Sequence, residues 1–207
     1  MTKVKVAKPK WKVIKPYTPE QIKAMLKVCD WDYAHNAKLL GSRNRAMVLV
    51  LYDTGLRLSE LVSLNLQDID VERGWIRAQG KGSKERMVRI GRTAQKALWR
   101  YLMHRPKNGR QEIWLSEEGK PLHDSGVQSV VDRLKKRAGI SEEGCIHRFR
   151  HSFALNFLKV DRNPFNLQYL LGHSSLEMVR HYTATLGMQD ALEAHVKASP
   201  ADLLGLK

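Results

Sequence analysis

Hydrophobic positions near the start of the chain recur with the period of a helix. The stretch TPEQIKAMLKVCDW predicts a helix with Thr18 as its cap, Pro19 in the first turn and Gln21 reaching back to the cap. Residues 43–54 are apolar on nearly all sides, which is typical of a buried central helix, and Gly55 is expected to end it.

The period of the pattern then changes. The stretch LSELVSL predicts a short helix, with Ser59 as its cap. Residues 74–79 and 85–90 alternate between apolar and polar positions, as strands do, and the Gly-rich turn GKGSK joins them. We therefore expect an antiparallel hairpin, with QDIDV as the candidate for a third short strand.

Helical spacing returns in the second half of the chain. Two apolar stripes predict helices, one made of Ala94, Ala97, Leu98, Tyr101 and Leu102, the other of Val127, Val130, Val131 and Leu134. IHRFRHSFALNFLKV, NLQYLLGH and the segment around Tyr182 predict three more. The fold class expected from the sequence is α+β: a mainly helical domain with one small antiparallel sheet.

The net charge of the chain limits the classes of function that the sequence favours. Lys and Arg number 36 and Asp and Glu number 21 in 207 residues, which gives a net charge of +15. Such an excess favours a polyanionic partner, with nucleic acid ahead of an anionic membrane surface. No apolar run reaches the roughly 18 residues of a membrane span, and the basic N-terminus lacks the apolar middle of a signal peptide. Cys29 and Cys145 are interpreted as reduced thiols of a cytoplasmic protein.

The first candidate for chemistry is HRFRH. On a helix, His147, Arg150 and His151 share one face, next to the apolar residues that follow them. Such a basic face favours an anion, because buried cations are costly without one. A solvated basic face is the alternative. His147 and His151 also have the spacing of paired zinc ligands, but no further ligand lies near them in the sequence and Arg150 would repel a dication.

The second candidate is the stretch DTGLRLSEL. Arg57 follows the glycine turn and Glu60 begins the next helix. An arginine on a tight turn has a preset direction and a planar guanidinium that suits phosphate oxygens. A local ion pair between Arg57 and Glu60 is the alternative.

The third candidate is the hairpin tip, where Lys81 and Lys84 alternate with glycine and serine. A lysine there can enter a DNA groove or reach a leaving oxygen, although a polar loop explains it equally well. His173 follows a glycine turn and can simply cap or pack. Tyr182, nine positions later, is either a core aromatic or a nucleophile.

Together, these motifs resemble the catalytic domain of the tyrosine recombinases, the phage-integrase family. The family's motifs occur in the family's order over roughly residues 50–185, as TGLRLSEL, GKGSKERMV, HRFRHSF and LLGHSSLEMVRHYT. Their residues are most similar to those of Xer-type members and transposon integrases. The resemblance implies strand cleavage and religation through a 3′-phosphotyrosine, with no metal and no other cofactor.

The resemblance also implies roles for single residues. Arg57 and Arg150 match the arginines that grip the non-bridging oxygens of the scissile phosphate, and His173 matches a third donor to it. Such preorganised donors stabilise the charge that gathers on the phosphate during attack. Glu60 and His151 match supporting positions.

The remaining catalytic positions transfer protons or attack the phosphorus atom. Tyr182 matches the nucleophile, and His147 matches the histidine that takes up or returns the tyrosine proton. Lys81 matches the general acid for the leaving 5′ oxygen. A free phenol has a pKa near ~10 and therefore needs a base or a cationic setting.

The charge pattern and the resemblance together predict partners. Direct DNA contacts are expected from Lys84, Arg86, Arg133, Lys136 and Arg137. Double-stranded DNA is the expected partner, with tetramers forming on it and no membrane involved. A type IB topoisomerase, a telomere resolvase and a non-catalytic regulator derived from an integrase remain alternatives.

Three segments are expected along the chain. Residues 1–17 are interpreted as a basic arm or linker, 18–187 as the catalytic domain and 188–207 as a C-terminal helix or tail. Apolar residues of that tail can dock on a neighbouring subunit or on their own domain. Family members usually carry a further DNA-binding domain ahead of the catalytic one, so the sequence is either an excised piece or a minimal member.

Overall fold

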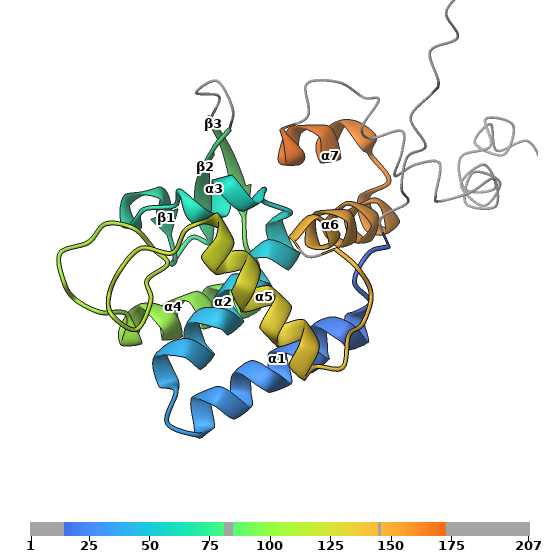
Figure 1. The fold of residues 1–207 in the computed structure, drawn as a ribbon. Coiled ribbons are helices and arrows are strands. Elements are labelled where there is room, and N and C mark those ends of the chain that lie inside the picture. Colours follow the sequence, from blue (N-terminus) through green and yellow to red (C-terminus); the bar gives the residue numbers. More distant parts are fainter. Residues whose placement is uncertain (1–14, 81–84, 145, 173–207) are drawn as a thin grey trace, which may run out of the picture.

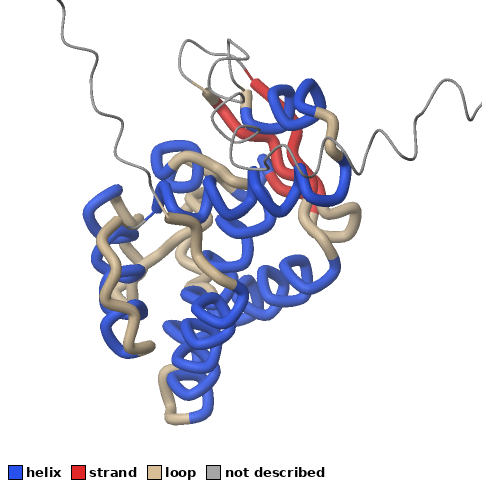
Figure 2. Tube along the Cα trace, turned by 90° about the vertical axis from the view of Figure 1, so that its right-hand side faces the viewer, coloured by secondary structure: helices blue, strands red, loops and turns tan. Residues whose placement is uncertain are grey.

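A computed structural model describes residues 15–80, 85–144 and 146–172. Within them the chain forms a mainly helical body with a small sheet at one end (Figure 1, Figure 2). The helices are α1 (Pro19–Ala34), α2 (Lys38–Thr54), α3 (Leu58–Val62), a 3-10 turn η1 (Leu66–Asp68), α4 (Arg92–His104), α5 (Asp124–Arg137), α6 (Ile146–Asp161) and α7 (Pro164–Leu171). The strands are β1 (Ile69–Asp70), β2 (Trp75–Gln79) and β3 (Glu85–Arg89). The predicted fold class is confirmed.

The start of α1 follows the sequence signal. The Thr18 hydroxyl accepts a hydrogen bond from the Gln21 backbone N–H at 3.3 Å, and the Gln21 side chain accepts one from the Thr18 N–H at 3.2 Å. Two backbone donors that the helix leaves unpaired are thereby satisfied. The predicted capping box is confirmed.

Helix α2 is the centre of the fold, and it contacts α1, α4, α5 and α6. Residues 46–51 are all buried, as predicted. Gly55 ends the helix in the left-handed region, with φ of +62°. A Cβ on Gly55 would meet Cδ1 of Phe153 at 2.8 Å, so glycine also allows α6 to lie against this turn.

The predicted cap of α3 is wrong. The helix begins at Leu58, and Arg57 is its capping position, two residues earlier than Ser59. The Glu60 side chain accepts the Arg57 backbone N–H at 2.8 Å, which satisfies the helix start from inside the helix. A hydroxyl cap is therefore unnecessary, and Ser59 is exposed.

The sheet has the order β1-β2-β3 and is antiparallel throughout. Both predicted hairpin strands are confirmed, and QDIDV contributes the two residues of β1. Across the hairpin, Ala78 pairs with Arg86 and Ile76 with Val88. Ile76, Ala78 and Val88 face the core. The hairpin tip, residues 81–84, lies outside the described residues.

The main core lies between α2, α4 and α5. Tyr101 of α4 stacks on Trp114 at 5.5 Å between ring centroids, and the Trp114 indole N–H donates to the Leu61 carbonyl oxygen at 2.9 Å. A smaller apolar cluster joins α6 to α7 through Leu158 and Leu167. None of the helices described in 15–172 is long and apolar enough to cross a membrane.

The chain ahead of α1 is attached to α6. Tyr17 is buried, and its backbone N–H donates to the Ser152 hydroxyl at 2.7 Å. Residues 15–17, the end of the range expected as a basic arm, are therefore packed against the domain. The helix expected around Tyr182 and the tail over 188–207 lie outside the described residues.

Candidate active site

Arg57 and Arg150 converge on the turn that ends α2. Arg57 lies two residues after Gly55, at the start of α3. Arg150 reaches the same turn from α6, where its Nη1 donates to the Gly55 carbonyl oxygen at 2.7 Å. Its Nη2 donates to the Leu171 carbonyl oxygen, also at 2.7 Å. Because Arg150 is buried, these two bonds fix the plane of its guanidinium.

Arg57 is the more accessible arginine, with 38% of its side chain exposed. Its Nη1 donates to Glu60 Oε1 at 2.8 Å. The local ion pair raised as the alternative interpretation of this motif is therefore present. The pair leaves the Arg57 side chain partly exposed, so it is compatible with a phosphate-binding role.

Glu60 is buried under two arginines. Its side chain is 1% exposed, and besides Arg57 it binds Arg86, with Nη1 at 2.6 Å from Oε1 and Nη2 at 2.8 Å from Oε2. Burial alone would raise the pKa of Glu60, but the hydrogen bonds from Arg86 and Arg57 outweigh it and lower the pKa to about 2. Glu60 is thus ionised at neutral pH.

The described site combines Arg57, Glu60, Arg86 and Arg150, which we call the arginine edge. The three arginines come from the start of α3, from β3 and from α6, and Figure 1 shows these elements in the upper half of the molecule. Helix α7 contacts both β3 and α6. Three cationic groups with a single buried carboxylate leave an excess of positive charge. Such an arrangement can stabilise a phosphate oxyanion.

Arg86 was expected to contact DNA, and the structure gives its guanidinium internal partners. Besides Glu60, it binds the Leu170 carbonyl oxygen through Nε at 2.8 Å, and its side chain is 8% exposed. No sequence pattern singles out this role, because Leu170 is 84 positions away.

The two histidines of HRFRH differ in exposure. His147 is exposed in the first turn of α6, and His151 is half-buried one turn later. Both therefore lie on the helix that carries Arg150. Lys81, Lys84, His173 and Tyr182 lie outside the described residues. Within 15–80, 85–144 and 146–172, no three His, Cys, Asp or Glu residues gather as a metal-binding group would.

Arg148 is a structural arginine that the sequence pattern did not reveal. It is 1% exposed, its Nε donates to the Lys15 carbonyl oxygen at 2.8 Å, and its guanidinium lies 4.0 Å from the Tyr17 ring centre. It attaches the start of the chain to α6. No local pattern indicates this role, because Lys15 lies 133 positions away in the sequence.

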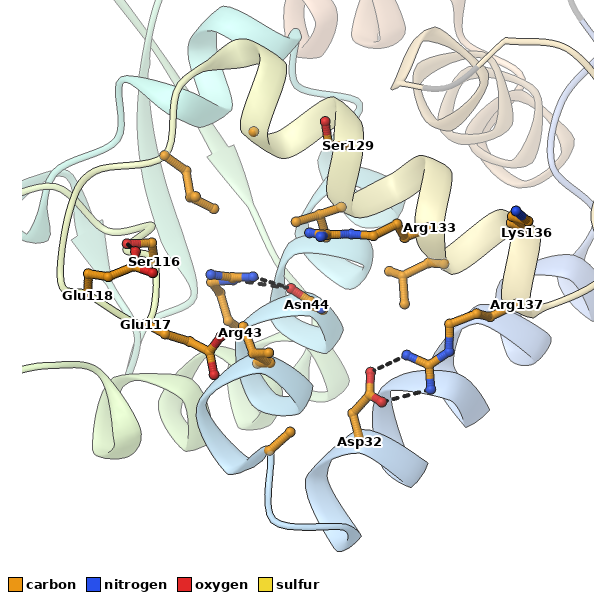
Figure 3. Close-up of a pocket in the computed structure, with 16 residues that line it drawn as sticks. Asp32, Arg43, Asn44, Ser116, Glu117, Glu118, Ser129, Arg133, Lys136 and Arg137 are labelled. Carbon is orange, nitrogen blue, oxygen red and sulfur yellow. Dashed lines mark hydrogen bonds and ion pairs between the residues drawn. The ribbon is translucent and has the colours of Figure 1, made fainter.

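Three more of the expected DNA contacts line a pocket of about 450 Å³ between α1, α2 and α5, shown in Figure 3. Arg133 and Lys136 line it beside Arg137, which binds Asp32 through two hydrogen bonds of 2.7 and 2.8 Å. Arg43 is buried and also lines the pocket, and desolvation lowers its pKa. No member of the arginine edge lines this pocket.

Comparison with known proteins decides the family. The model of the phage integrase family matches residues 15–187. The chain belongs to the phage integrase family. The matched range contains the arginine edge and also Lys81, His173 and Tyr182.

Relatives within the family include Xer recombinases. The chain is 34% identical over 179 residues to the tyrosine recombinase XerD of Listeria monocytogenes, covering 80% of this chain and 60% of the relative. It is 36% identical over 169 residues to XerC of Oceanobacillus iheyensis, covering 78% and 55%. The chain therefore spans about 60% of the length of the XerD relative that it matches.

Solved structures share the fold. XerA recombinase has a TM-score of 0.74 at 25% identity, covering 91% of this chain and 67% of that one. XerH bound to a palindromic difH substrate, in a post-cleavage complex, has a TM-score of 0.72 at 25% identity, covering 92% and 54%. The Tn1549 transposon integrase bound to transposon right end DNA has a TM-score of 0.73 at 23% identity, covering 94% and 68%. The fold is that of a tyrosine recombinase catalytic domain.

Proposed function

We propose that this chain is the catalytic part of a site-specific DNA recombinase that cuts and rejoins strands through a phosphotyrosine at Tyr182. The convergence of Arg57 and Arg150 on one turn carries the proposal, since two arginines held near the same turn can bind the non-bridging oxygens of one phosphate. Family membership supports it.

The proposed reaction keeps bond number and charge in balance. The Tyr182 oxygen attacks the phosphorus, a Tyr–O–P bond forms, and the bond from phosphorus to the 5′ oxygen breaks. The tyrosine proton passes to His147, and Lys81 gives a proton to the leaving 5′ oxygen. Arg57, Arg150 and His173 stabilise the charge that develops on the phosphate. Reversal with another 5′ hydroxyl joins a new strand without ATP.

Recognition of duplex DNA is the second part of the proposal. Lys84, Arg133, Lys136 and Arg137 are proposed to contact phosphates, in keeping with the net charge of +15. Tetramer formation on paired sites is proposed for the exchange step. Relatives solved with DNA include XerH on difH and a lambda integrase dimer on a core site.

The test is covalent capture. The full chain is incubated with a pool of nicked duplexes whose central positions are randomised, and DNA linked to protein is recovered and sequenced. We expect capture of a defined sequence through its 3′ phosphate at Tyr182, and loss of capture in Tyr182→Phe with DNA binding retained. An adduct formed by Tyr182→Phe, or no adduct with any duplex, would refute the proposal.

A second readout separates this function from the alternatives. The captured sequence is placed twice on one plasmid, and the products are analysed. Recombinant circles are expected from a site-specific recombinase. Relaxation without exchange would indicate the topoisomerase alternative, and binding without any adduct would indicate a regulator.

A further inference from the structure

All four terminal carbonyls of α7 have a hydrogen-bond donor. The last four carbonyl oxygens of a helix have no partner within it. The Gly172 N–H donates to the carbonyls of Gln168 and Tyr169. The other two take arginines from distant elements, Leu170 from Arg86 at 2.8 Å and Leu171 from Arg150 at 2.7 Å.

These two arginines bind the C-terminal end of α7. The negative end of the helix dipole favours cations at this position. Gly172 follows with φ of +62°, and a Cβ on it would lie 3.1 Å from Arg86 Cδ. The Arg86 side chain therefore packs over the last residue before His173, the expected third phosphate donor.

The same Arg86 guanidinium also fixes Arg57. Glu60 Oε1 accepts hydrogen bonds from both arginines, from Arg86 at 2.6 Å and from Arg57 at 2.8 Å. Arg57 thus reaches its position through a carboxylate that Arg86 holds from the other side. Arg86 itself lies at the second residue of β3, directly after the hairpin segment that carries Lys81.

We propose that Arg86 is a positioning residue for strand cleavage, which aligns Arg57 through Glu60, while its bond to the Leu170 carbonyl holds its guanidinium in place. This inference rests on the proposed function. All three guanidinium nitrogens bind inside the protein, so Arg86 acts without touching the phosphate. Lysine cannot replace it fully, because one ammonium cannot hold a carboxylate side-on and a carbonyl in the same plane.

Two other roles make different predictions. If Arg86 contacted DNA directly, as the sequence suggested, its replacement would weaken DNA binding and lower the salt dependence of that binding. A purely stabilising role would lower the melting temperature and leave the cleavage rate of the folded protein intact. A positioning role lowers the cleavage rate at saturating DNA and leaves affinity nearly unchanged.

The same sheet offers a matched control. Arg77 of β2 binds the buried carboxylate of Asp68 through Nη2 at 2.8 Å and Nε at 3.1 Å, and this pair has no bond to the arginine edge. Arg77→Ala therefore removes an arginine from a buried carboxylate just as Arg86→Ala does. Only Arg86→Ala should slow cleavage.

The experiment uses the full chain and the duplex captured by wild-type protein. Single-turnover adduct formation at saturating DNA, DNA affinity and melting temperature are measured for Arg86→Ala, Arg86→Lys and Arg77→Ala. We expect Arg86→Ala to cleave about 100-fold more slowly, since small misplacements of catalytic groups have effects of that size. Arg86→Lys should recover part of the rate, and affinity should stay within about threefold, because the phosphate contacts remain. Arg77→Ala should cleave at the wild-type rate.

A double variant keeps the test valid if Arg86→Ala folds poorly. In Glu60→Gln with Arg86→Ala, no unpaired buried carboxylate remains, and the cleavage defect should equal that of Glu60→Gln alone. Wild-type rates in Arg86→Ala, additive defects in the double variant, or a loss of affinity that accounts for the whole effect would overturn the inference. Failure of wild-type protein to capture any duplex would instead refute the proposed function.

Discussion

The main core around α2 and the arginine edge are held together by different forces. In the core, Met47, Val50 and Leu98 are fully buried among other apolar residues, and burial itself supplies the stability. In the arginine edge, Arg86 and Arg150 donate hydrogen bonds to a carboxylate and to three backbone carbonyls. The strength of these bonds depends on their direction and length. The core contributes stability alone, whereas the edge contributes stability and also aligns the groups that the proposed chemistry needs.

The largest stability effect should come from the core. Leu98→Ala in α4 leaves a cavity beneath a fully buried position, and we expect a loss of about 3–4 kcal/mol. The cleavage rate per folded molecule should stay unchanged, because α4 carries no member of the arginine edge. Denaturant unfolding measures the first quantity and single-turnover capture the second. Met103→Ala on the exposed face of α4 is the control, and an equal loss there would contradict the comparison.

Next in size is the buried carboxylate. The pKa of Glu60 is about 2 in the folded protein, below its ordinary value of 4.5. Ionised Glu60 therefore stabilises the fold above about pH 4.5, by about 3 kcal/mol, and this contribution is lost as the pH falls toward 2. Glu60→Gln should be less stable than wild type by about that amount at pH 7, with the difference shrinking at acid pH.

Unfolding curves of both proteins from pH 7 to pH 2 test this. Unlike Leu98→Ala, Glu60→Gln should also slow cleavage, since Arg57 loses its partner. A difference in stability that stays constant with pH would show that Glu60 is not held ionised by Arg86 and Arg57.

The two regions also differ in how far the sequence predicts them. The capping box of α1 and the end of α2 at Gly55 depend on neighbours within four residues, so local patterns identify them. Burial of α2 and the register of the hairpin follow from periodicity. The cap of α3 was mispredicted because its five residues carry no periodic signal and Glu60 takes the place of a hydroxyl.

The arginine edge could be predicted only in part. Motif order identified Arg57, Arg150 and Glu60 as site residues. The partners of Arg86 lie 26 and 84 positions away, and those of Arg150 lie 95 and 21 positions away. Backbone carbonyls carry no sequence identity, so no pattern of residue types indicates that α7 ends on two arginines.

A smaller effect should appear at Gly172, where the edge meets the end of α7. Gly172→Ala must hold φ of +62° and place a methyl group against Arg86. Gly139, after α5, has φ of +70° with no atom within 4 Å of an added Cβ, so Gly139→Ala carries the backbone strain alone. Gly139→Ala should lose about 1–2 kcal/mol, and Gly172→Ala should lose more because of the added contact with Arg86.

Only Gly172→Ala should also slow cleavage, by about tenfold, because it displaces Arg86. Melting curves and single-turnover capture of the two variants provide the measurement. Equal cleavage rates for the two would remove the link between the end of α7 and the chemistry.

The smallest stability effect is expected at Asp32 and Arg137, beside the pocket in Figure 3. The pair has good geometry, but 44% of the Arg137 side chain is exposed. Solvent therefore screens the pair, and Asp32→Asn should lower the stability by no more than about 1 kcal/mol.

The same pair should have a larger effect on DNA binding, because Asp32 binds the Arg137 guanidinium that we propose as a phosphate contact. Arg137→Ala should lower the slope of log affinity against log salt by about 0.9, the value for one phosphate contact. Asp32→Asn should keep that slope and tighten binding, since it frees Arg137. If instead both variants bind DNA as wild type does, with the same salt slope, the Asp32–Arg137 pair only joins α1 to α5, and the phosphate contacts must come from other residues.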